Sequence, residues 1–260
     1  MWNKELEAAI KAGLAAKEKI MEIYNHGFEV EIKSDHSPVT LADKTADKMI
    51  REALAKEFPK YGFLTEESED NLERRKKDCI WIVDPVDGTK DFVAKNGEFT
   101  TNIALAYKGE AVLGVVVLPA FDTYYYAVKG QGAYKVIKNG KPERIHVNDK
   151  TDDLTVLCSN FHLSDLDKAV IKKHEDRIKH VKQFGSSIKT CKIAEGSAEL
   201  SYRMTNGTKE WDTAAMQVVI EEAGGYLLKL DTLEPIRYNR EDVYNREGYI
   251  VVNRKENILL

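Results

Sequence analysis

The hydrophobic period of the chain changes at Cys79, and this change restricts the fold more than any other feature. Before it, apolar residues recur about every 3.6 positions over residues 3–25 and 43–58, which predicts two amphipathic helices. Pro59 ends the second helix because proline cannot continue one. After Cys79 the apolar runs are short and separated by Gly and Pro, which predicts strands. We therefore expect an α/β fold in which helices and sheets form layers.

The strand pattern divides the chain into two parts. Five runs separated by turn residues predict an antiparallel meander, and Asn139-Gly140 adds a strong hairpin signal. The five runs are residues 79–83, 99–107, 111–118, 123–128 and 133–137. Beyond them strand and helix patterns alternate, which favours an α/β unit with a mixed sheet. The prediction is an N-terminal α+β domain over residues 1–150 and a C-terminal α/β domain over residues 151–260, joined by the polar stretch 148–153.

Composition excludes several classes of protein. Lys and Arg number 39 against 43 Asp and Glu, so the net charge of −4 offers no field for a nucleic-acid polymer or an anionic membrane. The longest apolar run, residues 112–120, is far shorter than the roughly 20 residues of a membrane helix. Charges recur throughout the first 20 residues, unlike in a secretory signal, which predicts a cytoplasmic protein. The expected oligomeric state is a monomer or a homodimer. Cys79, Cys158 and Cys191 are too scattered to predict disulfides.

The segment 81–92, WIVDPVDGTKDF, is the most informative motif. An apolar strand delivers Asp84 and Asp87, with a proline between them that fixes the backbone and a glycine after them that lets a ligand approach. Asp-Pro and Asp-Gly are also ordinary turn dipeptides, so an isolated copy would indicate only a turn. This copy follows another acidic pair, Glu66-Glu67, at the end of the apolar run 61–64. Acidic groups at the ends of two strands can converge.

Asp212 is a further acidic candidate, at the start of an apolar helix pattern. Alone it would indicate only a helix cap. If it meets Glu66, Asp84 and Asp87, mutual repulsion requires a compensating positive charge. Oxygen donors without His or Cys favour Mg²⁺, with Mn²⁺ as an alternative, and Mg²⁺ commonly binds a few carboxylates together with a substrate phosphate. The pattern therefore predicts phosphate chemistry.

Three separated motifs together resemble the inositol monophosphatase superfamily of Mg²⁺-dependent, lithium-sensitive phosphatases. They are Asp84-Pro-Val-Asp-Gly-Thr89, Glu66-Glu67-Ser68, and Trp211-Asp-Thr-Ala-Ala215 followed by Ala223-Gly-Gly225. The motifs occur in the order found in that superfamily, and the match spans nearly the whole chain. The resemblance implies a layered α/β sandwich of the inositol monophosphatase and fructose-1,6-bisphosphatase type.

Two further segments are similar to the 3′(2′),5′-bisphosphate nucleotidase branch of that superfamily. They are residues 90–100, KDFVAKNGEFT, and residues 185–189, GSSIK. The inositol phosphatases more often carry Thr-Asn where Lys90-Asp91 stand here. Residues 203–209 depart from the nucleotidases, which usually have Gly-Pro before the Trp-Asp motif. The branch resemblance implies a role in sulfur assimilation.

The resemblance also implies roles for individual residues. Glu66, Asp84 and the Val86 carbonyl would hold one cation, and Asp84, Asp87 and Asp212 a second, with two or three Mg²⁺ ions in all. Asp43, in the hairpin before the second helix, would pair with Thr89 to orient and deprotonate the attacking water, and Glu66 is the third catalytic candidate. The predicted substrate-binding residues are Asp87, Gly88, Thr89, Ser187, Lys189 and Asp212. For Ser187 and Lys189 a helix cap and a surface lysine are equally simple interpretations.

The expected function is hydrolysis of a small-molecule phosphate monoester by metal-activated water. The leading hypothesis is conversion of 3′-phosphoadenosine 5′-phosphate to AMP and phosphate. One alternative within the superfamily is an inositol-1-monophosphatase or a broad sugar-phosphate phosphatase. An alternative of another class is a nucleotide- or metal-sensing protein that does not turn over its ligand.

Overall fold

The computed structural model describes residues 1–34, 37–70 and 72–260 of the chain. The helices are α1 (Asn3–His26), α2 (Leu41–Glu57), α3 (Thr89–Val93), α4 (Asp165–Lys173), α5 (Ile188–Ala194) and α6 (Glu210–Glu222), with short 3-10 turns at Glu73–Lys76, Pro119–Phe121 and Lys255–Asn257. The first nine strands are β1 (Val30–Ile32), β2 (Pro38–Thr40), β3 (Gly62–Thr65), β4 (Cys79–Asp87), β5 (Thr100–Tyr107), β6 (Glu110–Leu118), β7 (Thr123–Val128), β8 (Gly132–Ile137) and β9 (Glu143–Ile145). The remaining strands are β10 (Leu154–Cys158), β11 (Ile178–Gln183), β12 (Leu200–Arg203), β13 (Tyr226–Lys229) and β14 (Tyr249–Val252).

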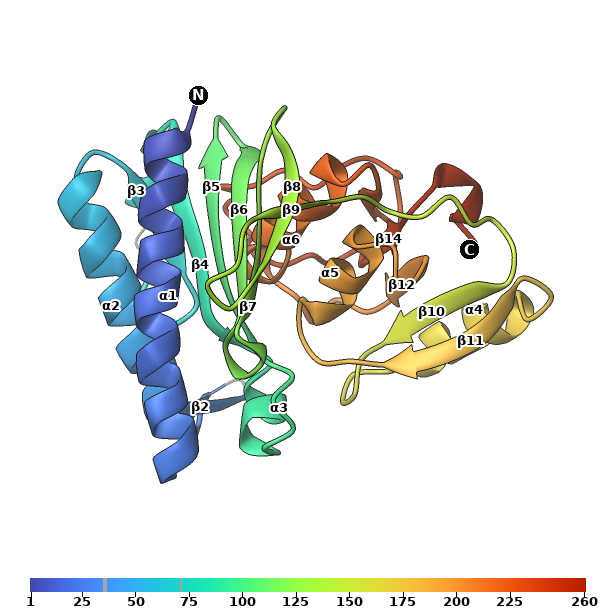
Figure 1. The fold of residues 1–260 in the computed structure, drawn as a ribbon, viewed down its shortest axis with the longest axis horizontal. Coiled ribbons are helices and arrows are strands. Elements are labelled where there is room, and N and C mark those ends of the chain that lie inside the picture. The colour runs from blue at the N-terminus through green and yellow to red at the C-terminus, as the bar shows by residue number, and fades with distance from the viewer. Residues whose placement is uncertain (35–36, 71) are drawn as a thin grey trace.

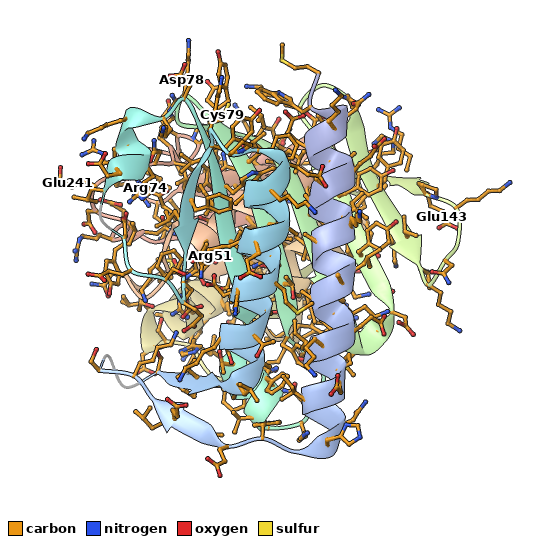
Figure 2. All side chains as sticks on the ribbon, turned by 90° about the vertical axis from the view of Figure 1, so that its left-hand side faces the viewer. Arg51, Arg74, Asp78, Cys79, Glu143 and Glu241 are labelled. Atoms are coloured by element: carbon orange, nitrogen blue, oxygen red, sulfur yellow. The ribbon has the colours of Figure 1, made fainter. Side chains whose placement is uncertain are left out.

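These elements form alternating layers of helix and sheet, as predicted (Figure 1). Helices α1 and α2 cover the outer face of a seven-stranded sheet, where they lie side by side in Figure 2. Helices α5 and α6 lie between that sheet and a five-stranded sheet, and α4 covers the far face of the second sheet. The predicted layered α/β architecture is therefore confirmed.

The seven-stranded sheet has the order β3-β4-β5-β6-β7-β8-β9. All neighbours from β4 to β9 are antiparallel, so the predicted meander is confirmed, and β8 and β9 form the hairpin indicated by Asn139-Gly140. Strand β3 pairs in parallel with β4 at the edge. The predicted strand 79–83 is too short, because β4 continues through the acidic motif to Asp87.

Side-chain alternation along β4 explains why helices cover both faces of this sheet. Trp81 and Val83 point into the core under α1 and α2, whereas Ile80 and Ile82 point into the core formed with α5 and α6. Successive strand residues face opposite sides, so a continuous apolar run fits a strand buried on both faces. This arrangement fixes the direction in which the acidic end of β4 emerges.

The five-stranded sheet is mixed, as predicted, with the order β11-β10-β12-β14-β13. Strand β10 is parallel to β11 and β12, and β14 is antiparallel to β12 and β13. The division at residue 150 stays a prediction. One apolar core contains residues from both sides of it, because α6 packs between the two sheets.

Gly114 of β6 permits the closest contact between α6 and the first sheet. A Cβ atom at Gly114 would lie 2.2 Å from the backbone oxygen of Ala215. We expect Gly114→Ala to lower the free energy of unfolding by about 1–3 kcal/mol, the usual cost of overpacking a core. Urea unfolding of the two proteins measures this. An unchanged midpoint would show that α6 does not pack this closely on β6.

The cysteines are free; Cys158 and Cys191 are buried, and Cys79 is partly exposed. In the described ranges of the chain, no helix combines the length and the apolar character that crossing a membrane requires.

Candidate active site

Asp84, Asp87 and Asp212 come together at one place. A carboxylate oxygen from each lies within 4.8 Å of the others. The regular pairing of β4 with β5 is interrupted between Asp84 and Asp87, so the strand bends where the two acids leave it. Asp212 arrives from the first turn of α6. The convergence of remote acidic residues that the sequence analysis required is therefore present.

This cluster is electrostatically unfavourable without a cation. Burial raises the pKa of Asp84 well above its ordinary value, and the charges of Glu66 and Asp87 raise it further. Burial raises the pKa of Asp212 to about 8, with Asp87 and Glu66 again adding to the shift. Like-charged carboxylates out of water disfavour one another's ionised form. A site of this kind is satisfied by protons or by hard divalent cations, and its oxygen donors suit Mg²⁺.

Asp87 is oriented by a set of donors on one oxygen. Its Oδ2 atom accepts hydrogen bonds from the Ser187 backbone N–H and hydroxyl, both at 2.9 Å, and from Asn102 Nδ2 at 3.1 Å. Thr100 Oγ1 lies 3.3 Å from the same oxygen. These bonds hold the carboxylate in one rotamer. Ser187, proposed from the sequence as a substrate contact, thus faces Asp87, and although it precedes α5 its side chain caps nothing there.

Asp43 and Thr89 form the second predicted pair. Thr89 Oγ1 lies 3.2 Å from Asp43 Oδ1 and 3.2 Å from the carbonyl oxygen of Val86. The other Asp43 oxygen accepts from the Thr40 backbone N–H at 2.8 Å and from the Thr40 hydroxyl at 2.6 Å. The placement of Asp43 in the preceding hairpin was wrong. Thr40 caps α2 in a capping box with Asp43, so the helix begins at Leu41 and Asp43 lies in its first turn.

Glu66 lines the same pocket but is not one of the three clustered carboxylates. Its Oε1 atom lies 3.0 Å from Lys33 Nζ, and Lys33 also contacts Glu67. The paired glutamates raise the pKa of Lys33 against the opposing effect of burial. Lys33 therefore supplies a positive charge at the edge of the acidic cluster. The sequence analysis missed this lysine because 33 residues separate it from Glu66.

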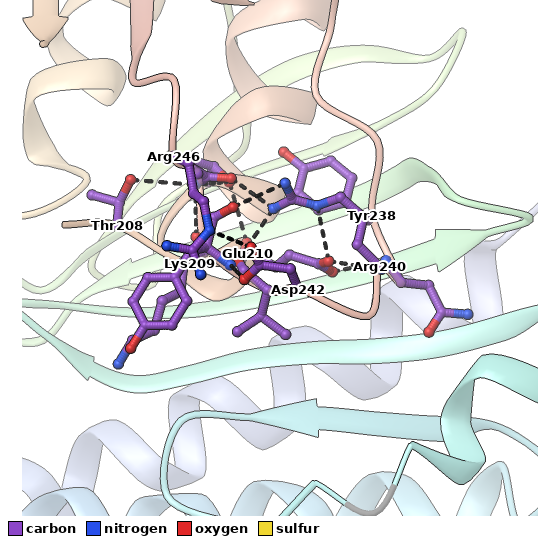
Figure 3. Close-up of polar contacts among 12 residues, drawn as sticks. Thr208, Lys209, Glu210, Tyr238, Arg240, Asp242 and Arg246 are labelled. Atoms are coloured by element: carbon purple, nitrogen blue, oxygen red, sulfur yellow. Dashed lines mark hydrogen bonds and ion pairs between the residues drawn. The ribbon is translucent and has the colours of Figure 1, made fainter. Parts of the chain in front are cut away.

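The start of α6, which positions Asp212, is anchored by a buried ion pair (Figure 3). Glu210 is fully buried and accepts from the backbone N–H groups of Asn239 at 2.7 Å and Arg240 at 2.8 Å. The Arg240 guanidinium Nε lies 3.1 Å from the same carboxylate. Asp212 itself accepts a short hydrogen bond from the Lys209 backbone N–H. Because Glu210 is buried and accepts three hydrogen bonds from a partly exposed arginine and two backbone N–H groups, it fixes the helix end.

A pocket of about 600 Å³ opens over the cluster. Gly88, Thr89, Ser187 and Lys189, four of the predicted substrate-binding residues, line it together with Arg203. Lys189 Nζ donates to the Ser186 carbonyl at 2.7 Å, and burial lowers its pKa while Asp87 opposes that shift. The carboxylate cluster of Asp84, Asp87 and Asp212 forms the acidic wall of this pocket, and Lys189 and Arg203 form its basic wall.

Arg203 and His162 are pocket residues that the sequence analysis did not assign to the site. In the part of the chain that the structure describes, Arg203 Nε is buried and has no hydrogen-bond partner. Burial lowers the pKa of His162 to about 4, and the neighbouring Arg203 charge lowers it further. An unpaired buried donor beside a pocket indicates a site for an acceptor. The only sequence signal was the unusual segment that begins at Arg203.

Comparison with known proteins agrees with this geometry. The model of the inositol monophosphatase family matches residues 1–259. The 3′(2′),5′-bisphosphate nucleotidase CysQ of Buchnera aphidicola is 36% identical over 230 residues, covering 86% of this chain and 84% of the relative. The protein of the same name from Escherichia coli K12 is 35% identical over 239 residues, covering 91% of this chain and 94% of the relative.

A solved structure gives the same result. The crystal structure of CysQ from Bacteroides thetaiotaomicron superimposes with a TM-score of 0.84 at 36% identity, covering 98% of this chain and 99% of that one. Family model, relatives and structure all extend over most of the chain, so the chain belongs to the inositol monophosphatase family.

Proposed function

We propose that this protein hydrolyses 3′-phosphoadenosine 5′-phosphate to AMP and phosphate. The observation that carries the proposal is a single pocket that is lined both by a carboxylate cluster and by the basic side chains of Lys189 and Arg203. The acidic side suits the ester that is cleaved, and the basic side suits a second phosphate that is retained. The 35–36% identical relatives named 3′(2′),5′-bisphosphate nucleotidase support this choice.

Mg²⁺ fits the acidic wall. Asp84, Asp87 and Asp212 would hold it, with Glu66 and the Val86 carbonyl as further ligands for a second or third ion; Mn²⁺ suits the same donors. When bound, the cations offset the carboxylate charge and stabilise the negative charge that develops on the phosphoryl oxygens. The raised pKa values of Asp84 and Asp212 support the assignment, because such carboxylates gain most from a nearby cation.

Asp43 and Thr89 act on the attacking water. The Thr89 hydroxyl has one proton and two acceptors in reach, Asp43 and the Val86 carbonyl. As the water attacks phosphorus, it passes a proton to Thr89, and Thr89 passes its own to Asp43. The bond between phosphorus and the 3′ ester oxygen breaks in the same displacement, and that oxygen takes a proton from solvent water to leave as the 3′-hydroxyl of AMP. Burial raises the pKa of Asp43, which makes it a better base than an exposed carboxylate.

The basic wall selects the substrate. Lys189 and Arg203 line the pocket, and the buried Arg203 Nε has no hydrogen-bond partner among the described residues. Arg binds phosphate bidentately, and Lys supplies a compact charge. We place the second phosphate of the nucleotide between Lys189 and Arg203. Ser187 contributes by orienting Asp87, and the backbone of Gly88 lies near the ester that is cleaved.

Phosphate release from 3′-phosphoadenosine 5′-phosphate and from inositol 1-phosphate tests the proposal. We expect kcat/KM to favour the nucleotide at least tenfold in the presence of Mg²⁺, and Arg203→Ala to remove most of that preference, since an Arg–phosphate contact commonly contributes about 1.5–3 kcal/mol. A tenfold preference for the inositol ester would assign the protein to the inositol or sugar phosphatases instead. Tight nucleotide binding without turnover would indicate a sensing protein.

A further inference from the structure

The two segments that resemble the nucleotidases, residues 90–100 and 185–189, lie in contact in the structure, and Asn160 binds the first of them. The Asn160 side-chain amide donates to Asp91 Oδ1 at 2.7 Å and to Glu98 Oε2 at 2.7 Å. Asp91 and Glu98 belong to the segment 90–100, and Asn160 follows β10 in the other half of the chain. Asn96 also donates to Asp91 Oδ1, at 2.6 Å. Because all these bonds have a charged acceptor, they are among the stronger kind.

The Glu98 carboxylate also holds the start of the segment 185–189. Glu98 Oε2 accepts the backbone N–H of Gly185 at 2.8 Å. A Cβ atom at Gly185 would lie 2.2 Å from the Glu98 carbonyl oxygen and 2.7 Å from the Asp91 carboxylate. Only glycine permits this approach, so the contact between the two segments requires the residue found there.

The segment is therefore fixed at two points. Gly185 is bonded to Glu98, and Ser187 is bonded to Asp87 through both its N–H and its hydroxyl. Between them Ser186 has a φ of +46°, a conformation that L residues seldom adopt without support from their surroundings. Lys189 lies three residues after Ser186 and donates back to the Ser186 carbonyl. The position of the Lys189 ammonium thus depends on both attachments.

We propose that Asp91, Glu98 and Asn160 form a clamp that positions the segment 185–189, and with it Lys189, for the second phosphate of the substrate. They are positioning residues, because Asn160 and Glu98 are not among the residues that line the pocket and none of the three belongs to the carboxylate cluster. Burial lowers the pKa of Lys189 and the neighbouring Arg203 charge adds to that shift, whereas the charges of Asp87 and Asp91 oppose it. The inference rests on the proposed function, since it explains how the basic wall is held.

Asn160→Ala tests the clamp because it removes both side-chain bonds at a partly buried position away from the pocket. We expect KM for 3′-phosphoadenosine 5′-phosphate to rise about tenfold with kcat nearly unchanged, while hydrolysis of p-nitrophenyl phosphate, which has no second phosphate, stays within about twofold. Asn148→Ala is the matched control. Asn148 is also partly buried, and its amide donates to the Gly196 carbonyl and to the Glu199 carboxylate, neither of which belongs to the segments 90–100 and 185–189.

Amide hydrogen exchange gives a readout that does not depend on turnover. In Asn160→Ala, the amides of Gly185 and Ser187 exchange faster, whereas Asn148→Ala leaves them unchanged. Equal loss of activity on both substrates, or an unchanged KM for the nucleotide, overturns the clamp. If the unaltered enzyme shows no preference for the nucleotide, the proposed function fails, and that result is visible before any variant is made.

A second pair of variants keeps the test decisive if Asn160→Ala does not fold. Glu98→Gln retains an oxygen that accepts from Gly185, so we expect nucleotide KM within about threefold of the unaltered value, whereas Glu98→Ala loses the acceptor and raises it about tenfold. Identical behaviour of the two substitutions would refute a role for the acceptor oxygen.

Discussion

Asp87→Asn is expected to reduce kcat for phosphate release by about a thousandfold, because several kcal/mol of transition-state stabilisation by cations depend on this carboxylate. The same substitution relieves repulsion in the cation-free protein. Asp87 raises the pKa values of both Asp84 and Asp212, and a neutral amide would not. The amide oxygen still accepts from Ser187 and Asn102, so the fold is retained. We therefore expect a melting temperature in EDTA that equals or exceeds that of the unaltered protein, together with a weaker response to Mg²⁺.

Steady-state assays at saturating Mg²⁺ and thermal melts with and without EDTA measure both effects. Asp176→Asn is the control, since Asp176 is exposed and is not among the residues that line the pocket. Phosphate release that survives Asp87→Asn within about tenfold would show that the cluster is not the catalytic centre. A large drop in melting temperature would show instead that Asp87 is chiefly structural.

The parts of the fold that local patterns encode were predictable. The helices before residue 60 and the meander after Cys79 follow from hydrophobic period alone. The hairpin of β1 and β2 was expected only from the family resemblance, because its strands have three residues each, with exposed or partly exposed side chains at most positions, and show no alternation. The parallel pairing of β3 with β4 also escaped prediction, because strand direction depends on the chain path between them.

The candidate site shows the same division. Asp84, Asp87 and Asp212 were identifiable because each stands in a compact motif. Lys33 and Arg203 stand in none, and only the folded chain brings Lys33 to Glu66 and Arg203 to the pocket. The two attachments of the segment 185–189 span 87 and 100 residues, so their partners could not be inferred from spacing.

The stability of the cation-free protein is expected to fall by about 2 kcal/mol as pH rises from about 6.5 to 8.5. Asp212 has a pKa of about 8 when folded and an ordinary value of 3.8. Between those values the folded chain holds a proton that the unfolded chain has released, so raising the pH favours unfolding until it passes the folded pKa. The pKa of His162 is lowered to about 4, so this residue makes stability rise with pH, but only below its ordinary pKa of 6.5.

Mg²⁺ reverses this dependence, because its carboxylate ligands must be ionised and its affinity therefore rises with pH. At about a hundred times its dissociation constant it adds about 2.7 kcal/mol, or roughly 5–10 °C in melting temperature for a chain of this size. Melts in EDTA and in Mg²⁺ across that pH range should therefore diverge as pH rises. Asp212→Asn should flatten the EDTA curve, since it removes the titrating group. Parallel melting curves in EDTA and Mg²⁺ across this pH range would contradict a shared site for protons and cations. If the two curves diverge and Asp212→Asn abolishes the divergence, proton binding and cation binding both belong to the carboxylates at the end of β4 and the start of α6.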